Sequence, residues 1–240
     1  MKHDLTKLSL GFKELEIHAT EDQLLQFDMY ISLLIEWNKK MNLTAIVQPE
    51  RIIIEHFLDS LSILKESKIE DYGSIIDVGT GAGFPGIPIK IMKPNINLVL
   101  LDSLKKRTEY LKAVRKELGL GDVKIIHTRA EDLGVNPEYR EKFDIVVSRA
   151  VAPLRVLCEY CMPFAKVGGL FISYKGPGAQ EELELARPCI GQMGGSKTPE
   201  IKEVLVPFSH KTHQLVYIQK GTKTPKRYPR SPGKIKKSPL

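Results

Sequence analysis

Two spacings of apolar residues divide the chain into a helical part and a mixed part. In the first 70 residues apolar positions recur three or four apart, as in TEDQLLQFDMYISLLIEWNKKMNL from Thr20, and this spacing predicts helices. Thr20 and Gln23 form a capping-box pattern at the start of that helix, and a second helix is predicted over residues 49–66. From about Ser74 short β-branched runs alternate with helical segments. We therefore expect a helical extension over residues 1–70 and an α/β domain over residues 71–220.

The α/β region predicts a doubly wound, mostly parallel sheet. Helical segments such as KKRTEYLKAVRKELG separate five short runs, which are SIIDV, NLVLLD, VKIIH, FDIVVS and GLFISYK. Strand and helix in alternation favour right-handed crossovers between parallel strands. Two further runs, IKEVLVPF and HQLVYIQK, are linked closely enough to pair antiparallel. We expect a Rossmann-like sheet that ends in an antiparallel strand.

The stretch DVGTGAGFPG contains two overlapping glycine fingerprints. Read from Gly81 it is G-x-G-x-x-G, which is typical of dinucleotide sites, and read from Asp77 it is D-x-G-x-G-x-G. Gly79, Gly81 and Gly83 let the loop turn sharply and bring its N–H groups close to a nucleotide-like ligand. An acid at position 77 favours the cationic amino-acid part of S-adenosylmethionine. The alternative is a strand-end aspartate that accepts hydrogen bonds from loop amides.

Acids after the next two strands extend this prediction. Asp102 ends the second run, where a carboxylate accepts hydrogen bonds from ribose hydroxyls of either cofactor. Ala130 and Glu131 follow the third run, where they would read the edge of the adenine ring in a methyltransferase, although a helix cap also explains them. Together with the antiparallel hairpin, these positions favour a class I S-adenosylmethionine-dependent methyltransferase fold over a nicotinamide-dependent oxidoreductase.

The segment after the fourth run, SRAVAP, lacks the residues of two common methyl-transfer chemistries. It has no Asn/Asp-Pro-Pro-aromatic loop for exocyclic amines and no cysteine for pyrimidine carbon-5. A purine ring nitrogen such as guanine N7 has an in-plane lone pair and needs only placement and a prepared pocket, so we expect no general base. Arg149 is the candidate electrostatic residue at the pocket lip. It would hold the cofactor carboxylate, a backbone carbonyl, an RNA phosphate or a guanine edge, unless it is an ordinary surface arginine.

Positive charge is concentrated at the C-terminal end. The net charge is +7, and residues 220–240 carry eight Lys or Arg and no acid, so the first 219 residues are close to neutral. The Pro-rich composition of residues 221–240 predicts a mobile arm that contacts phosphate backbones, or a solubilising tail. Residues expected to contact RNA are Lys106, Arg107, Lys175, Arg227 and Arg230. For Lys106, Arg107 and Lys175 a solvated face is the alternative.

Other residue types narrow the chemistry. No run approaches the roughly 18 apolar residues of a membrane span, and no secretory signal is evident, so we expect a cytoplasmic protein with reduced thiols. Cys158 and Cys161 have metal-type spacing without further ligands, which favours buried thiols and no metal site. His56 and Asp59 lie one helical turn apart, and a buried hydrogen-bonded pair is favoured over catalysis.

Several motifs together resemble one known family. They are WNKKMNLTAI, HFLDSL, IIDVGTGAGFPGIPIKI, LLDSLKKRTEYL, AED, VVSRAVAPL and the RYPRSPG of the tail. They are similar to the bacterial glucose-inhibited division protein B family, also called ribosomal RNA small-subunit methyltransferase G. The resemblance implies methylation of guanine N7 in 16S ribosomal RNA, and cofactor contacts at Gly79, Phe84, Ala130, Glu131 and Arg149. We expect the protein to act as a monomer. A methyltransferase for small molecules and a non-catalytic RNA-binding module remain alternatives.

Overall fold

The protein begins with a group of helices. The structure, a computed structural model, describes residues 1–66, 69 and 73–240. The helical part consists of α1 (Thr6–Glu14), α2 (Glu21–Met41), α3 (Pro49–Ile52), η1 (Ile53–Leu58) and α4 (Asp59–Glu66). The expected boundary between residues 70 and 71 lies outside the described residues.

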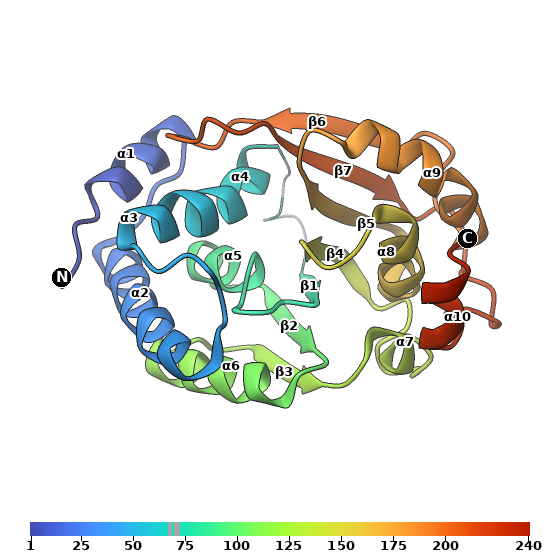
Figure 1. Cartoon of the computed structure of the whole chain (residues 1–240), viewed down its shortest axis with the longest axis horizontal. Helices are drawn as coiled ribbons and strands as arrows, with labels where there is room; N and C mark the ends of the chain where they lie inside the picture. The colour runs from blue at the N-terminus through green and yellow to red at the C-terminus, as the bar shows by residue number, and fades with distance from the viewer. Residues whose placement is uncertain (67–68, 70–72) are drawn as a thin grey trace.

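A seven-stranded sheet forms the centre of the α/β part. Its strands are β1 (Ser74–Val78), β2 (Asn97–Asp102), β3 (Val123–His127), β4 (Phe143–Arg149), β5 (Ala165–Lys175), β6 (Glu200–Val204) and β7 (His213–Gln219). Their order is β3-β2-β1-β4-β5-β7-β6. The first five strands pair in parallel, whereas β7 lies between β5 and β6 and is antiparallel to both. The mostly parallel sheet with an antiparallel hairpin is confirmed (Figure 1).

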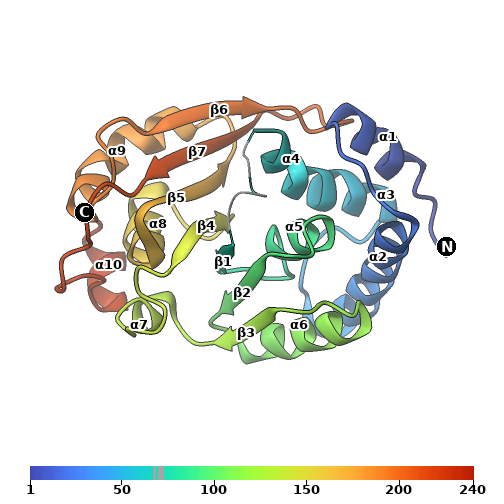
Figure 2. The same ribbon diagram turned by 180° about the vertical axis from the view of Figure 1, so that it is seen from behind.

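Helices cover both faces of this sheet, as Figures 1 and 2 show from opposite sides. The remaining helices are α5 (Gly86–Met92), α6 (Lys105–Glu117), α7 (Ala130–Leu133), α8 (Leu154–Cys161), η3 (Met162–Phe164), α9 (Ala179–Gln192) and α10 (Pro232–Lys237). Alternate strand residues face opposite cores, because side chains alternate along a strand. Ile75 and Leu98 pack with the N-terminal helices, α5 and α6, while Ile76 and Val99 pack with α8 and α9.

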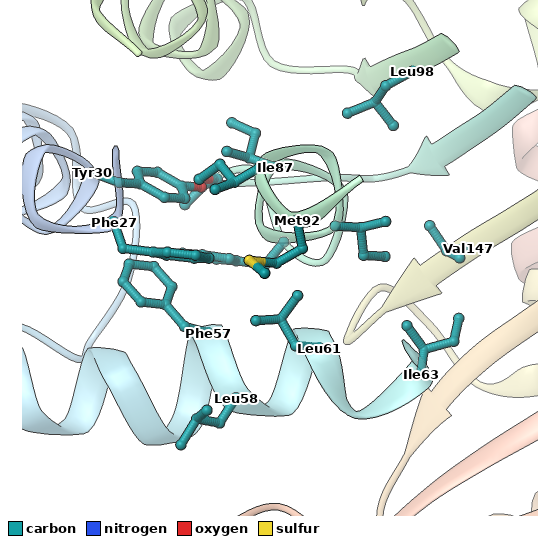
Figure 3. Close-up of a cluster of buried hydrophobic side chains, with 14 of the residues drawn as sticks. Phe27, Tyr30, Phe57, Leu58, Leu61, Ile63, Ile87, Met92, Leu98 and Val147 are labelled. Carbon is teal, nitrogen blue, oxygen red and sulfur yellow. The ribbon is translucent and has the colours of Figure 1, made fainter. Parts of the chain in front are cut away.

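The helical extension shares a hydrophobic core with the sheet. Phe27 and Tyr30 of α2 contact Phe57 of η1, with ring centroids 4.9 and 5.4 Å apart. Ile87 of α5 and Val147 of β4 belong to the same cluster (Figure 3). Burial of apolar area is the main stabilising contribution to such a core. The extension is therefore held by the same packing that holds one face of the sheet.

Local signals account for the boundaries of the first helices. The predicted capping box is present, because the Thr20 side chain accepts from the Gln23 amide and the Gln23 side chain accepts from the Thr20 amide. Residues 49–66 are helical as predicted, but Ile53–Leu58 form a π-helical turn inside that helix. Such turns occur frequently at functional sites. Apolar spacing does not reveal them.

Residues 221–240 differ from the mobile arm that their composition predicts. Tyr228 and Ile235 are buried, and Arg230 binds the buried carboxylate of Glu159 on α8. Lys220, counted with the basic tail, is also buried, and its Nζ donates to the carbonyl of Met162 over 2.7 Å. In the structure two apolar anchors and an ion pair hold the segment against the domain. The three cysteines are free and buried, as expected of apolar thiols.

Candidate functional site

The glycine loop joins the carboxyl end of β1 to α5. Gly79, Gly81 and Gly83 have φ values of 73°, 61° and 98°, which glycine adopts without the strain that a side chain would bring. The amides of Gly79 and Thr80 donate to the carbonyl of Leu101, over 2.8 and 3.1 Å. This backbone pairing fixes the loop against the end of β2. The position of the loop therefore depends on β2 being the neighbour of β1 in the sheet.

Asp77, near the end of β1, holds the loop through hydrogen bonds. It is fully buried, and its Oδ2 accepts from Thr80 Oγ1 at 2.7 Å and from the Gly86 amide at 2.9 Å. Its Oδ1 has no hydrogen-bond partner among the described residues. Burial raises the pKa of this carboxyl to about 6, although the hydrogen bonds from Thr80 and Gly86 oppose the rise. These contacts match the alternative of an aspartate that binds loop amides.

A cavity of about 500 Å³ lies beside this loop, at the carboxyl ends of β1 and β2. Four predicted cofactor residues line it, namely Gly79, Asp102, Ala130 and Glu131. The other four, Gly81, Gly83, Phe84 and Arg149, are not among its lining residues. Lining residues that sequence reasoning missed include Val151, Arg155, Tyr160, Lys236 and Pro239. We call this space the donor cavity.

The residues present fit an adenosine-containing donor. The volume is in the range of cofactor pockets, and the walls combine apolar side chains with polar and charged ones, as a nucleoside with ribose hydroxyls requires. Asp102, 3% exposed, binds the amides of Gly81 and Leu104 through separate oxygens, each at 2.9 Å. These bonds orient the carboxylate that would accept ribose hydroxyls. A Cβ on Gly79 would lie 2.5 Å from Val151 Cγ2, so only glycine leaves this wall its present shape.

Arg149 ends β4 and lies among residues of the helical extension. Its NH1 donates to Asp59 Oδ2 and to the carbonyl of Glu55 at 3.2 Å. The guanidinium also lies over the ring of Phe84, 5.1 Å from its centroid, and the ring of His56 stacks on Phe84 at 4.5 Å. Phe84 and Arg149 are therefore brought together, next to the donor cavity rather than in it.

Asp59 joins Arg149 to the hairpin. Its Oδ1 pairs with Nδ1 of His213 on β7 at 2.9 Å. Burial alone raises the pKa of the Asp59 carboxyl, but Arg149 and His213 outweigh burial and hold the pKa below its ordinary value. Burial, followed by the charge of Arg149, lowers the pKa of His56 to about 4. His56 and Asp59 do not bond to each other, but both contact the guanidinium of Arg149.

A second cavity, of about 700 Å³, is lined by these residues. Its walls come from η1, from the ends of β4 and β5, and from the start of β7, and they include Glu55, His56, Asp59, Arg149, Tyr174 and His213. We call it the acceptor cavity. Ala150 lines it, whereas Val151, the next residue, lines the donor cavity. Ala150 has a φ of 55°, a left-handed conformation that is uncommon for a residue with a side chain and is found preferentially at functional sites.

The predicted RNA-contact residues fall into two groups. Lys106 and Arg227 are exposed, and Arg107 lies 3.4 Å from Asp102. Lys175 instead donates to Glu182 at 2.7 Å and to the carbonyl of Ala152 at 3.0 Å, with 10% of its side chain exposed. Arg230 is bound to Glu159. Carboxylates within the chain therefore bind three of the five cations that were expected to meet RNA, and the Arg107 contact is the longest of the three.

The sheet order, the glycine loop and the donor cavity define a class I S-adenosylmethionine-dependent methyltransferase. Solved structures share this fold. An O-methyltransferase from Bacillus cereus in complex with SAH matches with a TM-score of 0.55 and 15% identity, over 80% of this chain and 91% of that one. A chain of the complex between the Haloferax volcanii Trm112 methyltransferase activator and a methyltransferase matches with a TM-score of 0.57 and 14% identity, over 79% and 98%.

The chain belongs to the GidB family, described as rRNA small subunit methyltransferase G, whose model matches residues 23–204. A relative from Alkaliphilus metalliredigens with the name ribosomal RNA small subunit methyltransferase G is 50% identical over 230 residues, 96% of each chain. One from Desulforamulus reducens with the same name is 49% identical over 239 residues, 99% of each chain. The protein is thus an rRNA methyltransferase that uses S-adenosylmethionine. No helix in the described part of the chain has the length and apolarity needed to cross a membrane.

Proposed function

We propose that this enzyme transfers a methyl group from S-adenosylmethionine to N7 of a guanine in 16S ribosomal RNA. One observation carries the proposal: the segment after β4 separates a donor cavity from an acceptor cavity, with Ala150 on one side and Val151 on the other. Ligands on the two sides of this segment would have their reacting atoms close together. Effective placement of this kind supplies a large part of many rate enhancements.

The donor cavity would hold S-adenosylmethionine, which supplies an electrophilic methyl group when bound. We propose that the backbone at Gly79, Gly81 and Gly83 approaches its amino-acid part, that Asp102 accepts from its ribose, and that Ala130 and Glu131 read its adenine. Phe84 contacts both the guanidinium of Arg149 and the ring of His56, and Arg149 NH2 lies 3.3 Å from His56 Nδ1, so these contacts would fix the direction of the guanidinium. Arg149 would then act as an electrostatic residue at the lip of the acceptor cavity.

Guanine N7 has a lone pair in the plane of the ring, so the acceptor cavity need not supply a base. Its titratable groups support this view. The lowered pKa of His56 leaves the imidazole neutral near pH 7, and both of its ring nitrogens have partners in Thr44, Arg149 and the Glu55 carbonyl. Asp59 is paired with Arg149 and His213. These residues would orient the acceptor and stabilise charge without taking a proton.

RNA would approach over exposed cations near the two cavities. We propose contacts at Lys106, Arg107 and Arg227, to which the exposed Arg129 and Arg155 at the donor cavity are natural additions. Phosphate contacts of this kind give an affinity that falls with salt. The internal partners of Lys175 and Arg230 argue against a direct role for these two. We further propose that the enzyme acts in the cytoplasm as a monomer on 16S RNA or on the small ribosomal subunit.

Mapping of modified 16S RNA tests the proposal. RNA from cells that lack this protein is incubated with the purified enzyme and methyl-labelled S-adenosylmethionine, and the labelled nucleotide is identified by mass spectrometry. We expect one N7-methylguanosine, and none when Arg149 is replaced by alanine. Label at another atom or only in small molecules would contradict the proposal, and binding of NADH in place of S-adenosylhomocysteine would revive the oxidoreductase alternative.

A further inference from the structure

The segment from Tyr228 to Leu240, which we call the C-terminal strap, reaches the donor cavity. Lys236 of α10 and Pro239 after it line the same space as Gly79, Asp102 and Glu131. Figures 1 and 2 show α10 beside α7 and α8, on the side of the sheet away from α2. A segment distant in sequence from the glycine loop thus forms part of the wall of the cofactor site.

Specific contacts hold the strap in this position. The Arg230 amide donates to Glu159 Oε1 at 2.8 Å, and its guanidinium donates to Glu159 Oε2 at 2.7 Å. Glu159 is fully buried, and a buried carboxylate left without its cation is strongly destabilising. Tyr228 is 5% exposed, and its hydroxyl binds Gln192 Oε1 on α9. Ile235 is fully buried in the core on that face of the sheet.

A wall at this position affects how well the cavity encloses a ligand. Small-molecule sites commonly bury most of the ligand surface, and affinity is lost when one side opens to solvent. Among the strap residues that line the cavity, Pro239 is apolar, and Lys236 carries a long aliphatic stem that covers apolar surface. Ile235, the residue before Lys236, is buried in the core and does not line the cavity, so it fixes the helix without forming part of the cavity wall.

We infer that the C-terminal strap is part of the donor-binding site, with Lys236 and Pro239 as its outer wall. The protein therefore binds the donor more tightly when the strap is docked against the domain than when it is not. Coupling of this kind is reciprocal, so the donor must also stabilise the docked strap. The inference depends on the donor site and is independent of which RNA atom is methylated.

Calorimetric titration with S-adenosylhomocysteine tests whether the docked strap raises the affinity for the donor. Ile235→Ala loosens α10 without changing a cavity residue, and we expect its dissociation constant to rise roughly fivefold or more. Lys234→Ala is the matched control, because Lys234 is exposed on the same helix and does not line the cavity. We expect the control to stay within about twofold of the wild type. Equal dissociation constants for the two variants would overturn the inference.

Limited trypsin digestion of the unmodified chain tests whether the donor stabilises the docked strap. This test does not depend on how a variant folds. We expect S-adenosylhomocysteine to slow cleavage after Lys236 and Lys237 at least fivefold, since the ligand must hold the strap docked. Cleavage after Lys197, an exposed residue remote from the donor cavity, serves as the internal control. Equal protection at both places would overturn the inference and leave the proposed function intact. If the wild type failed to bind S-adenosylhomocysteine, both the inference and the proposed function would be contradicted.

Discussion

The carboxylate of Asp59 binds the guanidinium of Arg149 across 90 residues of sequence, with 11% and 13% of the two side chains exposed. This contact links the helical extension to the end of β4, and the pairing of Asp59 with His213 continues it to the hairpin. Three parts of the fold therefore meet at one carboxylate. The acceptor cavity depends on all three.

Replacement of Asp59 by asparagine should slow methyl transfer more than it weakens donor binding. A hydrogen bond to a charged group contributes roughly 1.5–3 kcal/mol, which corresponds to a loss in kcat of about 10- to 100-fold if Arg149 is misplaced. Single-turnover kinetics with calorimetry for S-adenosylhomocysteine would separate the two effects. Glu50→Gln is the control, because its exposed carboxylate binds the exposed side chain of Lys7 and Glu50 does not line the acceptor cavity. Similar losses in both variants would contradict a positioning role for Asp59.

Gly79→Ala should impair donor binding more than Gly81→Ala. Both residues have positive φ, so each substitution introduces backbone strain of about 1 kcal/mol or more. Only at Gly79 would the new Cβ also meet Val151, at 2.5 Å, whereas at Gly81 it would lie 4.0 Å from the carbonyl oxygen of Gly79. Moving Val151 changes a wall of the donor cavity. We expect at least a tenfold difference in dissociation constant between the two variants, measured by calorimetry.

Acid should destabilise the fold through His56. Its pKa in the folded chain, about 4, is below the ordinary 6.5, so the unfolded chain binds more protons between these values. The contribution of His56 is complete above pH 6.5 and is lost as the pH falls toward 4, by up to about 3 kcal/mol. Urea unfolding of wild type and His56→Phe at several pH values measures it. We expect the difference between the two curves to shrink on acidification.

Asp77 should act in the opposite direction. Its pKa is raised from 3.8 to about 6, so the folded chain is the one that retains the proton in this range, and stability is lost as the pH rises through it. Asp77→Asn removes that loss. The variant should therefore gain unfolding free energy relative to the wild type between pH 4 and pH 6, measured by the same urea titrations. A parallel pair of curves would show that the carboxyl titrates normally.

Tyr30→Phe tests whether the helical extension supports the glycine loop. The Tyr30 hydroxyl donates to the carbonyl of Ala82 at 2.6 Å, and both groups are buried. Loss of the hydroxyl leaves that carbonyl without its partner, which destabilises the fold by about 1–3 kcal/mol. We expect weaker donor binding as well. Tyr174→Phe, whose hydroxyl binds the Ser60 carbonyl away from the loop, should lose stability with donor affinity unchanged.

The elements set by short-range patterns were predictable from the sequence. Residues 74–78 and 97–102 form strands at the predicted bounds, because β-branched runs lie between turn residues there. The Thr20 capping box lies within four residues of sequence. For the same reason the sequence alone predicts the glycine loop and the two acids, Asp102 and Glu131, that line the donor cavity.

Features that need distant partners were not predictable. His213 reaches Asp59 across 154 residues, and nothing in its own strand distinguishes it from a surface histidine. The partner of Arg230 is Glu159, 71 residues earlier, so the composition of the tail alone indicated mobility. In the sequence Lys175 resembles a solvent-facing lysine, and only the fold shows that it binds Glu182 on α9. Such pairs depend on how the layers pack, which local spacing does not encode.

The π-helical turn at Ile53–Leu58 determines in which direction the side chains after it point relative to the side chains before it. Each residue of an α-helix advances the side-chain direction by about 100°, so deletion of one residue from this turn would rotate Asp59 by about that angle relative to α3. No single side-chain replacement elsewhere would restore the lost orientation. In this segment the number of residues is thus constrained more tightly than their identity at exposed positions.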